Sequence, residues 1–523
     1  MGRQRKQFTL TDVQVLAGAP LVPEDSFYGR MATYSDKLVR EEMFADLYSH
    51  RGRPSVSPVL LSKVLLLMFH DNVSDRQAEE RARYDLRWKA ALHLGIGETG
   101  FDSTALTRFR ARLVLHEKER SFFEETVKAA RQYGLIRAEV AEVIDSTPVL
   151  GAGAVQDTYN LLRSAVRKML KAVRSQPEVH ERLRSLLKRQ DYDETGKPEI
   201  DWDDREARQA LLNELVQDAR TLLTETADLE LGPAEKGARE LLAAVTEQDV
   251  EEQADGTVAL KNGVAKDRVI STTDPEMRHG HKSSKGRFDG HKAHIMEDPE
   301  AEIITGVEVT AGNVPDADPL PDLLDQHEAV GLTVTEVVGD TAYGSGDIRA
   351  TMAERGVKLV APVPPEGKNG KYIPKSAFEI DLESRTCRCP AGHLVSMTGT
   401  RKKDRAGLFH FGELCRTCPL RDQCTNSRQG RTVTVHRYEA LLQKGRAEQK
   451  TDTFKAAYRK RPIVERKIAE LVRHGIRQAR YIGRAKVRLQ LAWTAAMVNL
   501  KRLFKQIAGV AAPKNQTEGV CPA

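Results

Sequence analysis

Apolar residues recur at helical spacing through the first quarter of the chain, within residues 34–130. The stretch SPVLLSKVLLLMFHDNVSDRQAEERARYDLRWKAALHL predicts several helices. After the break GIGETG, the stretch FDSTALTRFRARL predicts another helix, which Asp102 or Ser103 can cap. This helix carries Arg108, Arg110 and Arg112. Short helices with an arginine-bearing member are typical of helix-turn-helix DNA-binding domains, and equally of small helical bundles.

Runs of β-branched residues predict strands from residue 138 onward. AEVAEVIDSTPVL, residues 138–150, predicts a short strand that ends at Asp145. Residues 155–250 are charged and helical, so we interpret them as an insertion. Further strands are expected in GHKAHIMED, EIITGVEVTAGN, TVTEVVGD and VKLVAPV, with helices in DADPLPDLLDQHEAV and GDIRATMAERG. Apart from the insertion, this order is that of a ribonuclease-H-like α/β fold.

Charge is distributed unevenly along the chain. The net charge is only +6, but residues 458–505 hold fourteen Lys/Arg against two Glu, and residues 191–255 hold twenty Asp/Glu against six Lys/Arg. The dense basic block favours a phosphate-rich partner, namely nucleic acid, over a helix face with some other partner.

Two features predict a soluble, intracellular protein. No apolar run approaches the ~18 residues that a membrane span requires. No cysteine precedes Cys387, and five of the six fall within residues 387–424, which is not the distribution of a secreted disulfide scaffold.

Two aspartates stand in matching surroundings, each where a predicted strand stops. Asp145 lies in VIDST and Asp340 in VVGDTAYGS. If their strands are neighbours, the carboxylates repel each other unless a cation neutralises them. Oxygen ligands favour Mg²⁺ or Mn²⁺, and two such ions about 3.5–4 Å apart can clamp the attacking and leaving oxygens of a phosphodiester displacement. Glu465, inside the basic block, is the best candidate for a third acid, and Glu470 is the reserve.

Taken together, several segments carry a family resemblance. They are FDSTALTRFRARL, VIDST, DPEMRHGHKSSKGRFDGHKAHIMED, GVEVTAGNVPDADPL, VVGDTAYGS and RPIVERKIAELVRHGIRQARYIGRAKV. The chain resembles bacterial insertion-sequence transposases of the DDE class, most of all the IS1182 group related to the IS4 and IS5 families. The resemblance implies that Asp145, Asp340 and Glu465 form a catalytic triad that holds two Mg²⁺ or Mn²⁺ ions.

The resemblance also implies roles for residues near the third acid. Tyr458, Arg461 and Glu465 match the family's Tyr, Arg, Glu, Lys signature, but its final Lys falls at Val472. Arg473, one place beyond, is the shifted candidate for that phosphate contact. Because Pro462 is expected to begin the helix, Tyr458 and Arg461 are expected outside it.

The stretch GHKSSKGRFDGHKAHI is rich in both histidine and basic residues. His281, His291 and His294, with His279 just before, make a zinc site conceivable. The basic residues favour phosphate contact instead; they are Lys282, Lys285, Arg287 and Lys292.

Cysteines gather in two short clusters before the basic block. Cys387 and Cys389 lie in CRCPAGH, and Cys415, Cys418 and Cys424 in CRTCPLRDQC. This arrangement favours a structural zinc site, although five thiols exceed four ligands. Reduced free thiols and an iron–sulfur cluster remain open alternatives.

These predictions divide the chain into several units. We expect a helical N-terminal DNA-binding domain (1–135), a ribonuclease-H-like core (136–154 and 256–365), a helical charged insertion (155–255), a Cys-rich insertion (366–435), a basic helical part of the core with the third acid (436–508) and a disordered tail (509–523). The predicted function is DNA transposition by a bacterial, nucleoid-associated protein. Its partners would be double-stranded transposon ends and target DNA, on which it assembles as a homodimer. A metal-dependent nuclease without strand transfer, and a catalytically inactive DNA-binding derivative, remain alternatives.

Overall fold

The computed structural model describes residues 21–48, 55–194, 196–254, 256–282, 286–365, 372–399, 402 and 405–511. Lys285, a predicted phosphate contact, lies outside these described residues. Residues 512–523, most of the predicted tail, lie outside them as well.

The N-terminal part of the chain is helical, as predicted. Helix α6 begins at Ser103, and its N-cap is Asp102, whose carboxylate accepts a hydrogen bond from the backbone N–H of Thr104 at 2.8 Å. Helix α3 begins at Pro58, and most of its residues are buried because the other helices surround it. The helices are α2 (Phe27–Tyr34), α3 (Pro58–Asp71), α4 (Asp75–Tyr84), α5 (Leu86–Leu92), α6 (Ser103–Leu115) and α7 (Ser121–Gln132).

A mixed sheet forms the centre of the molecule, which confirms the α/β class. Its main strand order is β6-β5-β1-β7-β8, and β4 also pairs with β5. β1 and β5, and β5 and β6, are antiparallel, whereas β1 and β7, and β7 and β8, are parallel. The strands are β1 (Glu139–Leu150), β4 (Arg278–His281), β5 (Arg287–Asp298), β6 (Ile303–Ala311), β7 (Thr333–Val338) and β8 (Lys358–Val360), with α12 (Leu320–Ala329) and α13 (Gly346–Glu354) between the last three.

The prediction that the first strand ends at Asp145 is wrong, because β1 continues to Leu150. Pairing with β5 extends through Leu150 opposite Gly290, so a long partner strand overrides the turn-like DSTP sequence. Pro148 is tolerated because N–H groups alternate in direction along a strand. The N–H of Leu150 points away from β5 and donates to the Arg477 carbonyl at 2.9 Å. Position 148, two residues earlier, faces the same way, so the N–H that Pro148 lacks would not have bonded to β5.

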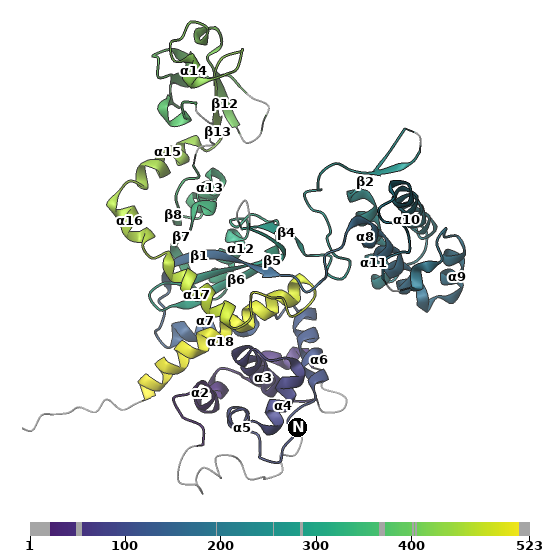
Figure 1. The fold of residues 1–523 in the computed structure, drawn as a ribbon. Helices are drawn as coiled ribbons and strands as arrows, with labels where there is room; N and C mark the ends of the chain where they lie inside the picture. The colour runs from purple at the N-terminus through teal and green to yellow at the C-terminus, as the bar shows by residue number, and fades with distance from the viewer. Residues whose placement is uncertain are drawn as a thin grey trace, which may run out of the picture.

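Helix α18 (Arg484–Ala511) packs between the N-terminal helices and the sheet (Figure 1). Its Trp493 is fully buried and stacks on Phe122, with ring centroids 5.1 Å apart. Asn499 bonds both backbone groups of Ile304, accepting from its N–H at 2.9 Å and donating to its carbonyl at 2.8 Å. The outer edge of β6 is thereby covered.

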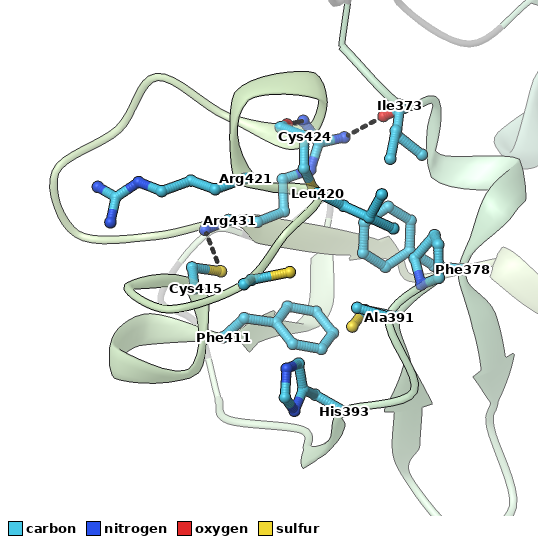
Figure 2. A pocket seen from close by; sticks show the side chains of 13 residues that line it. Ile373, Phe378, Ala391, His393, Phe411, Cys415, Leu420, Arg421, Cys424 and Arg431 are labelled. Atoms are coloured by element: carbon cyan, nitrogen blue, oxygen red, sulfur yellow. Dashed lines mark hydrogen bonds between the residues drawn. The ribbon is translucent and has the colours of Figure 1, made fainter.

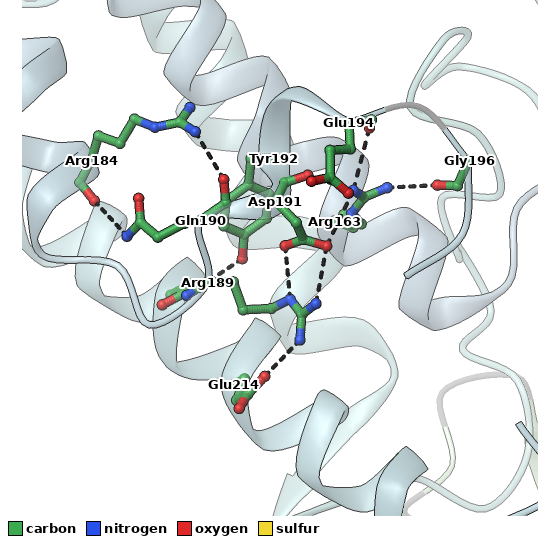
Figure 3. Close-up of polar contacts among 10 residues, drawn as sticks. Arg163, Arg184, Arg189, Gln190, Asp191, Tyr192, Glu194, Gly196 and Glu214 are labelled. Atoms are coloured by element: carbon green, nitrogen blue, oxygen red, sulfur yellow. Dashed lines mark hydrogen bonds and ion pairs between the residues drawn. The ribbon is translucent and has the colours of Figure 1, made fainter. Parts of the chain in front are cut away.

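A helical unit lies between β1 and β4 in the sequence and has its own apolar core. Within it, Arg163 and Arg189 both bind Asp191 (Figure 3). The buried Asp218 accepts hydrogen bonds from two backbone N–H groups and from the hydroxyl of Tyr192 at 2.7 Å. Its elements are α8 (Thr158–Ala172), α9 (Pro177–Ser185), α10 (Arg205–Glu225), α11 (Pro233–Gln248), β2 (Val250–Glu252) and β3 (Val258–Leu260).

A small unit containing the five described cysteines follows β8 and has a third, separate core. It comprises β9 (Glu379–Asp381), β10 (Thr386–Arg388), β11 (Leu394–Ser396), β12 (Arg405–His410), α14 (Arg421–Cys424) and β13 (Thr432–His436). Helices α15 (Glu439–Glu448) and α16 (Asp452–Tyr458) lead from it back to the sheet, where α17 (Pro462–Arg473) packs on β1 and β5 (Figure 1). In the part of the chain that the structure describes, no helix is long and apolar enough to cross a membrane.

Candidate active site

The register of two parallel strands brings the two predicted aspartates to the same edge of the sheet. Val143 of β1 lies opposite Val338 of β7, and Asp145 and Asp340 each follow two residues later. Because side chains alternate along a strand, equal offsets place the two carboxylates side by side. The carboxylate of Asp340 also caps the turn that follows, accepting from the backbone N–H of Ala342 at 2.8 Å.

Helix α17 supplies the third predicted acid. It begins at Pro462, so Tyr458, the last residue of α16, and Arg461, the N-cap, both lie outside it, as predicted. Val464, Lys467 and Leu471 are buried against the sheet. Glu465 lies in the exposed part of the first turn.

Arg461 binds all three candidate acids at once. Its Nη2 atom lies 3.1 Å from Asp145 Oδ2 and 4.0 Å from Asp340 Oδ2. Its Nη1 atom contacts Glu465 Oε1. Three carboxylates from three separate segments therefore converge on one positive group.

Burial and charge act on this site unequally. Burial raises the pKa of Asp145 to about 6, and the charges of Asp340 and Asp316 add to the rise, whereas Arg461 and the Ser146 N–H oppose it. The side chain of Asp145 is 17% exposed and that of Glu465 is 54% exposed. The site is thus open to solvent on its Glu465 side.

The possible metal ligands of this cluster are the carboxylates of Asp145, Asp340 and Glu465. All potential ligands are oxygens, the ligand type that Mg²⁺ and Mn²⁺ prefer, and one cationic group already lies among them. Among the described residues, no three His, Cys, Asp or Glu side chains stand in metal-ligand geometry. Here the guanidinium of Arg461 provides the neutralisation that a metal ion would provide.

The reserve acid, Glu470, is engaged elsewhere. Its carboxylate lies 3.4 Å from Lys467 Nζ and 3.2 Å from Lys501 Nζ. Lys467, itself buried, also lies 3.6 Å from Glu297 of β5. Glu470 therefore pairs with two lysines, apart from the Arg461 cluster.

Sequence reasoning missed one residue beside the aspartates, Tyr343. Tyr343 is 1% exposed, and its hydroxyl has no hydrogen-bond partner within the described ranges. Burial raises its pKa well above the ordinary value, and the charges of Asp316, Asp145 and Asp340 add to the rise. Tyr343 lies within the quoted VVGDTAYGS, but nothing in that pattern indicated a buried hydroxyl.

The structure divides the predicted DNA contacts into exposed and engaged groups. Arg110 is only 7% exposed and forms an ion pair with Asp75, and Lys292 is 9% exposed and lies 2.6 Å from Asp316. Both side chains are buried and engaged by an acid of the protein itself, so their contact with DNA stays a prediction. The exposed candidates are Arg108, Lys282, Arg287 and Arg473; Tyr458 and Arg112 are half-buried, and Arg112 lies over the ring of Tyr48.

The histidine-rich segment does not gather into a metal site within the described residues. His279 pairs with Asp289 at 2.5 Å and His291 with Asp274 at 3.3 Å. The buried His294 contacts the Thr310 hydroxyl at 2.8 Å. These three histidines have separate partners, so the conceivable zinc site there is not supported.

Three segments of the chain match family models. A model described as "Transposase DDE domain" matches residues 257–376, and a second model with the same description matches residues 388–504. A model described as "Transposase domain (DUF772)" matches residues 18–112. The chain belongs to the DDE transposases.

The two DDE matches include two of the three acids of this transposase. Asp340 lies in the first matched segment and Glu465 in the second, whereas Asp145 lies in neither. The assignment of Asp145 to the cluster of three acids rests on the strand register and on its contact with Arg461. No curated protein and no solved structure gives a significant match.

Proposed function

We propose that this DNA transposase cuts and joins DNA at one site formed by Asp145, Asp340 and Glu465 on a ribonuclease-H-like core. The contact of Arg461 with all three acids is the observation that supports the proposal best. The strand order β6-β5-β1-β7-β8, with its first three strands antiparallel, supports the assignment of the core.

The proposed site would hold two Mg²⁺ or Mn²⁺ ions through the three carboxylates. When bound, such ions would stabilise charge on the attacking and leaving oxygens of a phosphodiester displacement. The protein's own part is positioning. The Ser146 N–H donates to Asp145 at 2.7 Å and the Ala342 N–H donates to Asp340, while the buried Val464 and Leu471 hold α17, and with it Glu465, in place.

Two neighbouring features suit a DNA phosphate backbone. The site is open at Glu465, and exposed cations on α17, such as Arg466 and Arg473, continue from that opening. We propose that these cations bind transposon ends and target DNA. A homodimer assembled on DNA would bring two ends together.

The test uses DNA carrying the ends that flank the gene, with Mg²⁺ and the full-length chain. Asp145→Asn and Asp340→Asn should each lower the cleavage rate at least about a hundredfold, because several kcal/mol of charge stabilisation is lost. End binding in a gel-shift assay should stay near wild type. Glu470→Gln, outside the Arg461 cluster, is the matched control and should still cleave.

A second assay supplies pre-cleaved ends and a target plasmid. The proposal expects joined products from the wild-type chain. Cleavage without joining would support a nuclease instead, and end binding without any metal-dependent cleavage would support an inactive derivative. Wild-type cleavage by either aspartate variant would refute the site.

A further inference from the structure

The Cys-rich unit contains a small cavity that four of its five described cysteines line. Cys389, Cys415, Cys418 and Cys424 line it (Figure 2). The cavity has a volume of about 20 Å³, which is room for one ion or one water molecule. Its other walls are mainly apolar and include Ile373, Phe378, Phe411 and Leu420.

The fifth cysteine, Cys387, has a different environment. It is fully buried in the middle of β10, where its cross-strand neighbours are Ile380 and Val395. It does not line the cavity. The structure therefore reduces five candidate thiols to four, the number of ligands in a tetrahedral structural zinc site.

The cavity thiols come from two tight turns, as in structural zinc sites. Cys389 opens a turn in which its N–H donates to the His393 carbonyl at 2.9 Å, and the N–H of Gly392 donates to the Cys389 carbonyl at 2.8 Å. Gly392 has a φ of 87°, which glycine adopts without strain. Cys415 ends a short 3₁₀ turn, Cys418 follows after two residues, and Cys424 ends α14.

Polar groups around the cavity suit thiolates. The backbone N–H of Arg431 donates to Cys415 Sγ at 3.4 Å. The Arg431 side chain also lines the cavity, and its guanidinium is held by the Cys424 and Ile373 carbonyls, each at 3.1 Å. A fixed positive charge at the cavity wall would offset part of the negative charge of thiolates that bind a metal ion.

The unit also has little else to stabilise it. Its core consists of Phe378, Cys387, Phe409, Phe411, Cys415, Cys424, Val433 and Val435, so three of eight core residues are cysteines. None of the described cysteines forms a disulfide. Units of this size usually need a metal or disulfides because their apolar core is too small.

We propose that Cys389, Cys415, Cys418 and Cys424 bind one structural Zn²⁺ ion. Among the described residues no three of these side chains stand at ligand distances, so ligation requires the thiols to turn into the cavity they line. Four thiolates leave no open coordination position, so the ion stabilises the unit and takes no part in strand cleavage. The inference stands independently of the catalytic proposal.

The test measures metal content by mass spectrometry on full-length protein purified without added metal or chelator. We expect one zinc per chain in the wild type and loss of that zinc in Cys389→Ser and Cys418→Ser. Cys387→Ala is the matched thiol control and should keep its zinc. His393→Ala should keep it as well, although His393 also lines the cavity. Iron in place of zinc, zinc retained by Cys389→Ser and Cys418→Ser, or zinc lost from Cys387→Ala would each overturn the proposal.

A second measurement covers variants that fail to fold. Wild-type protein is stripped with a chelator under reducing conditions and titrated with Co²⁺, which replaces zinc and absorbs visible light. The proposal expects intense thiolate-to-cobalt absorption that saturates at one equivalent and disappears when Zn²⁺ is added. Absence of that absorption, with the protein still folded by circular dichroism, would mean free thiols and would refute the site.

Discussion

Glu297 is a buried acid beneath the helix that carries Glu465, and its protonation should affect stability strongly. Its side chain is 0% exposed, and its closest cation is Lys467 at 3.6 Å. Neither of its carboxyl oxygens accepts a hydrogen bond within the described residues. Burial raises the pKa of Glu297 from 4.5 to about 8; the Glu142 charge adds to the rise, and Lys467 opposes it.

The sign of the effect follows from proton linkage. Below pH 4.5 the carboxyl is protonated in both the folded and the unfolded chain, and the stability it provides is fully present. As the pH rises toward 8, the unfolded chain loses this proton while the folded chain keeps it, so each pH unit removes about 1.4 kcal/mol. Between pH 5 and pH 8 the loss amounts to about 4 kcal/mol.

Glu297→Gln removes this titration and keeps the shape of the side chain. The variant should therefore gain about 4 kcal/mol relative to wild type when the pH is raised from 5 to 8. Urea unfolding would be followed by tryptophan fluorescence in a Trp202→Phe background, so that the signal comes from the buried Trp88 and Trp493. The exposed Glu300, on the same hairpin, provides the control: Glu300→Gln should leave the pH dependence unchanged. A Glu297→Gln difference that stays constant within about 1 kcal/mol from pH 5 to 8 would refute the reasoning.

Three further changes test the packing around the site. Arg461→Met leaves Asp145 and Glu465 without their shared cation, so added Mg²⁺ should raise the Tm of the variant more than it raises the Tm of wild type. A smaller rise in the variant would contradict the idea that Arg461 neutralises the acids in place of a metal ion. Arg110→Leu leaves the Asp75 carboxylate unpaired and should cost about 2–4 kcal/mol in urea unfolding; unchanged stability with weaker DNA binding would make Arg110 a DNA contact after all. Gly290→Ala should cost at least about 3 kcal/mol in urea unfolding, because its φ is 151° and a Cβ atom would lie 2.2 Å from the Val149 carbonyl oxygen. A cost under about 1 kcal/mol would refute the strain.

Local patterns predicted the elements that carry the site. β-Branched runs and glycine turns marked the strands near Asp145 and Asp340, and Pro462 marked the start of α17 because proline suits a first helical turn. The length of β1 could not be predicted, since its last five residues depend on pairing with β5, nearly 150 positions away. Long-range pairing overrides local turn signals.

Side-chain partners were the part that the sequence could not supply. Arg110 and Lys292 looked like phosphate contacts because arginine and lysine are usually exposed, but Asp75 and Asp316 hold them in the protein. Cys387 looked equivalent to Cys389, two positions away, until the cavity separated them. The partners of the two candidate third acids could not be predicted either: Arg461 contacts Glu465, whereas lysines hold Glu470.

The most direct test of the three-acid site is a Mn²⁺ titration followed by electron paramagnetic resonance. The sharp signal of free Mn²⁺ decreases as the ions bind to the protein, so it measures the concentration of unbound Mn²⁺. The account predicts that Asp145→Asn, Asp340→Asn and Glu465→Gln each weaken binding at least about tenfold, which is about 1.4 kcal/mol, because each removes one ligand. Glu470→Gln should bind as wild type does. Wild-type Mn²⁺ affinity in Glu465→Gln, or a loss confined to Glu470→Gln, would contradict it.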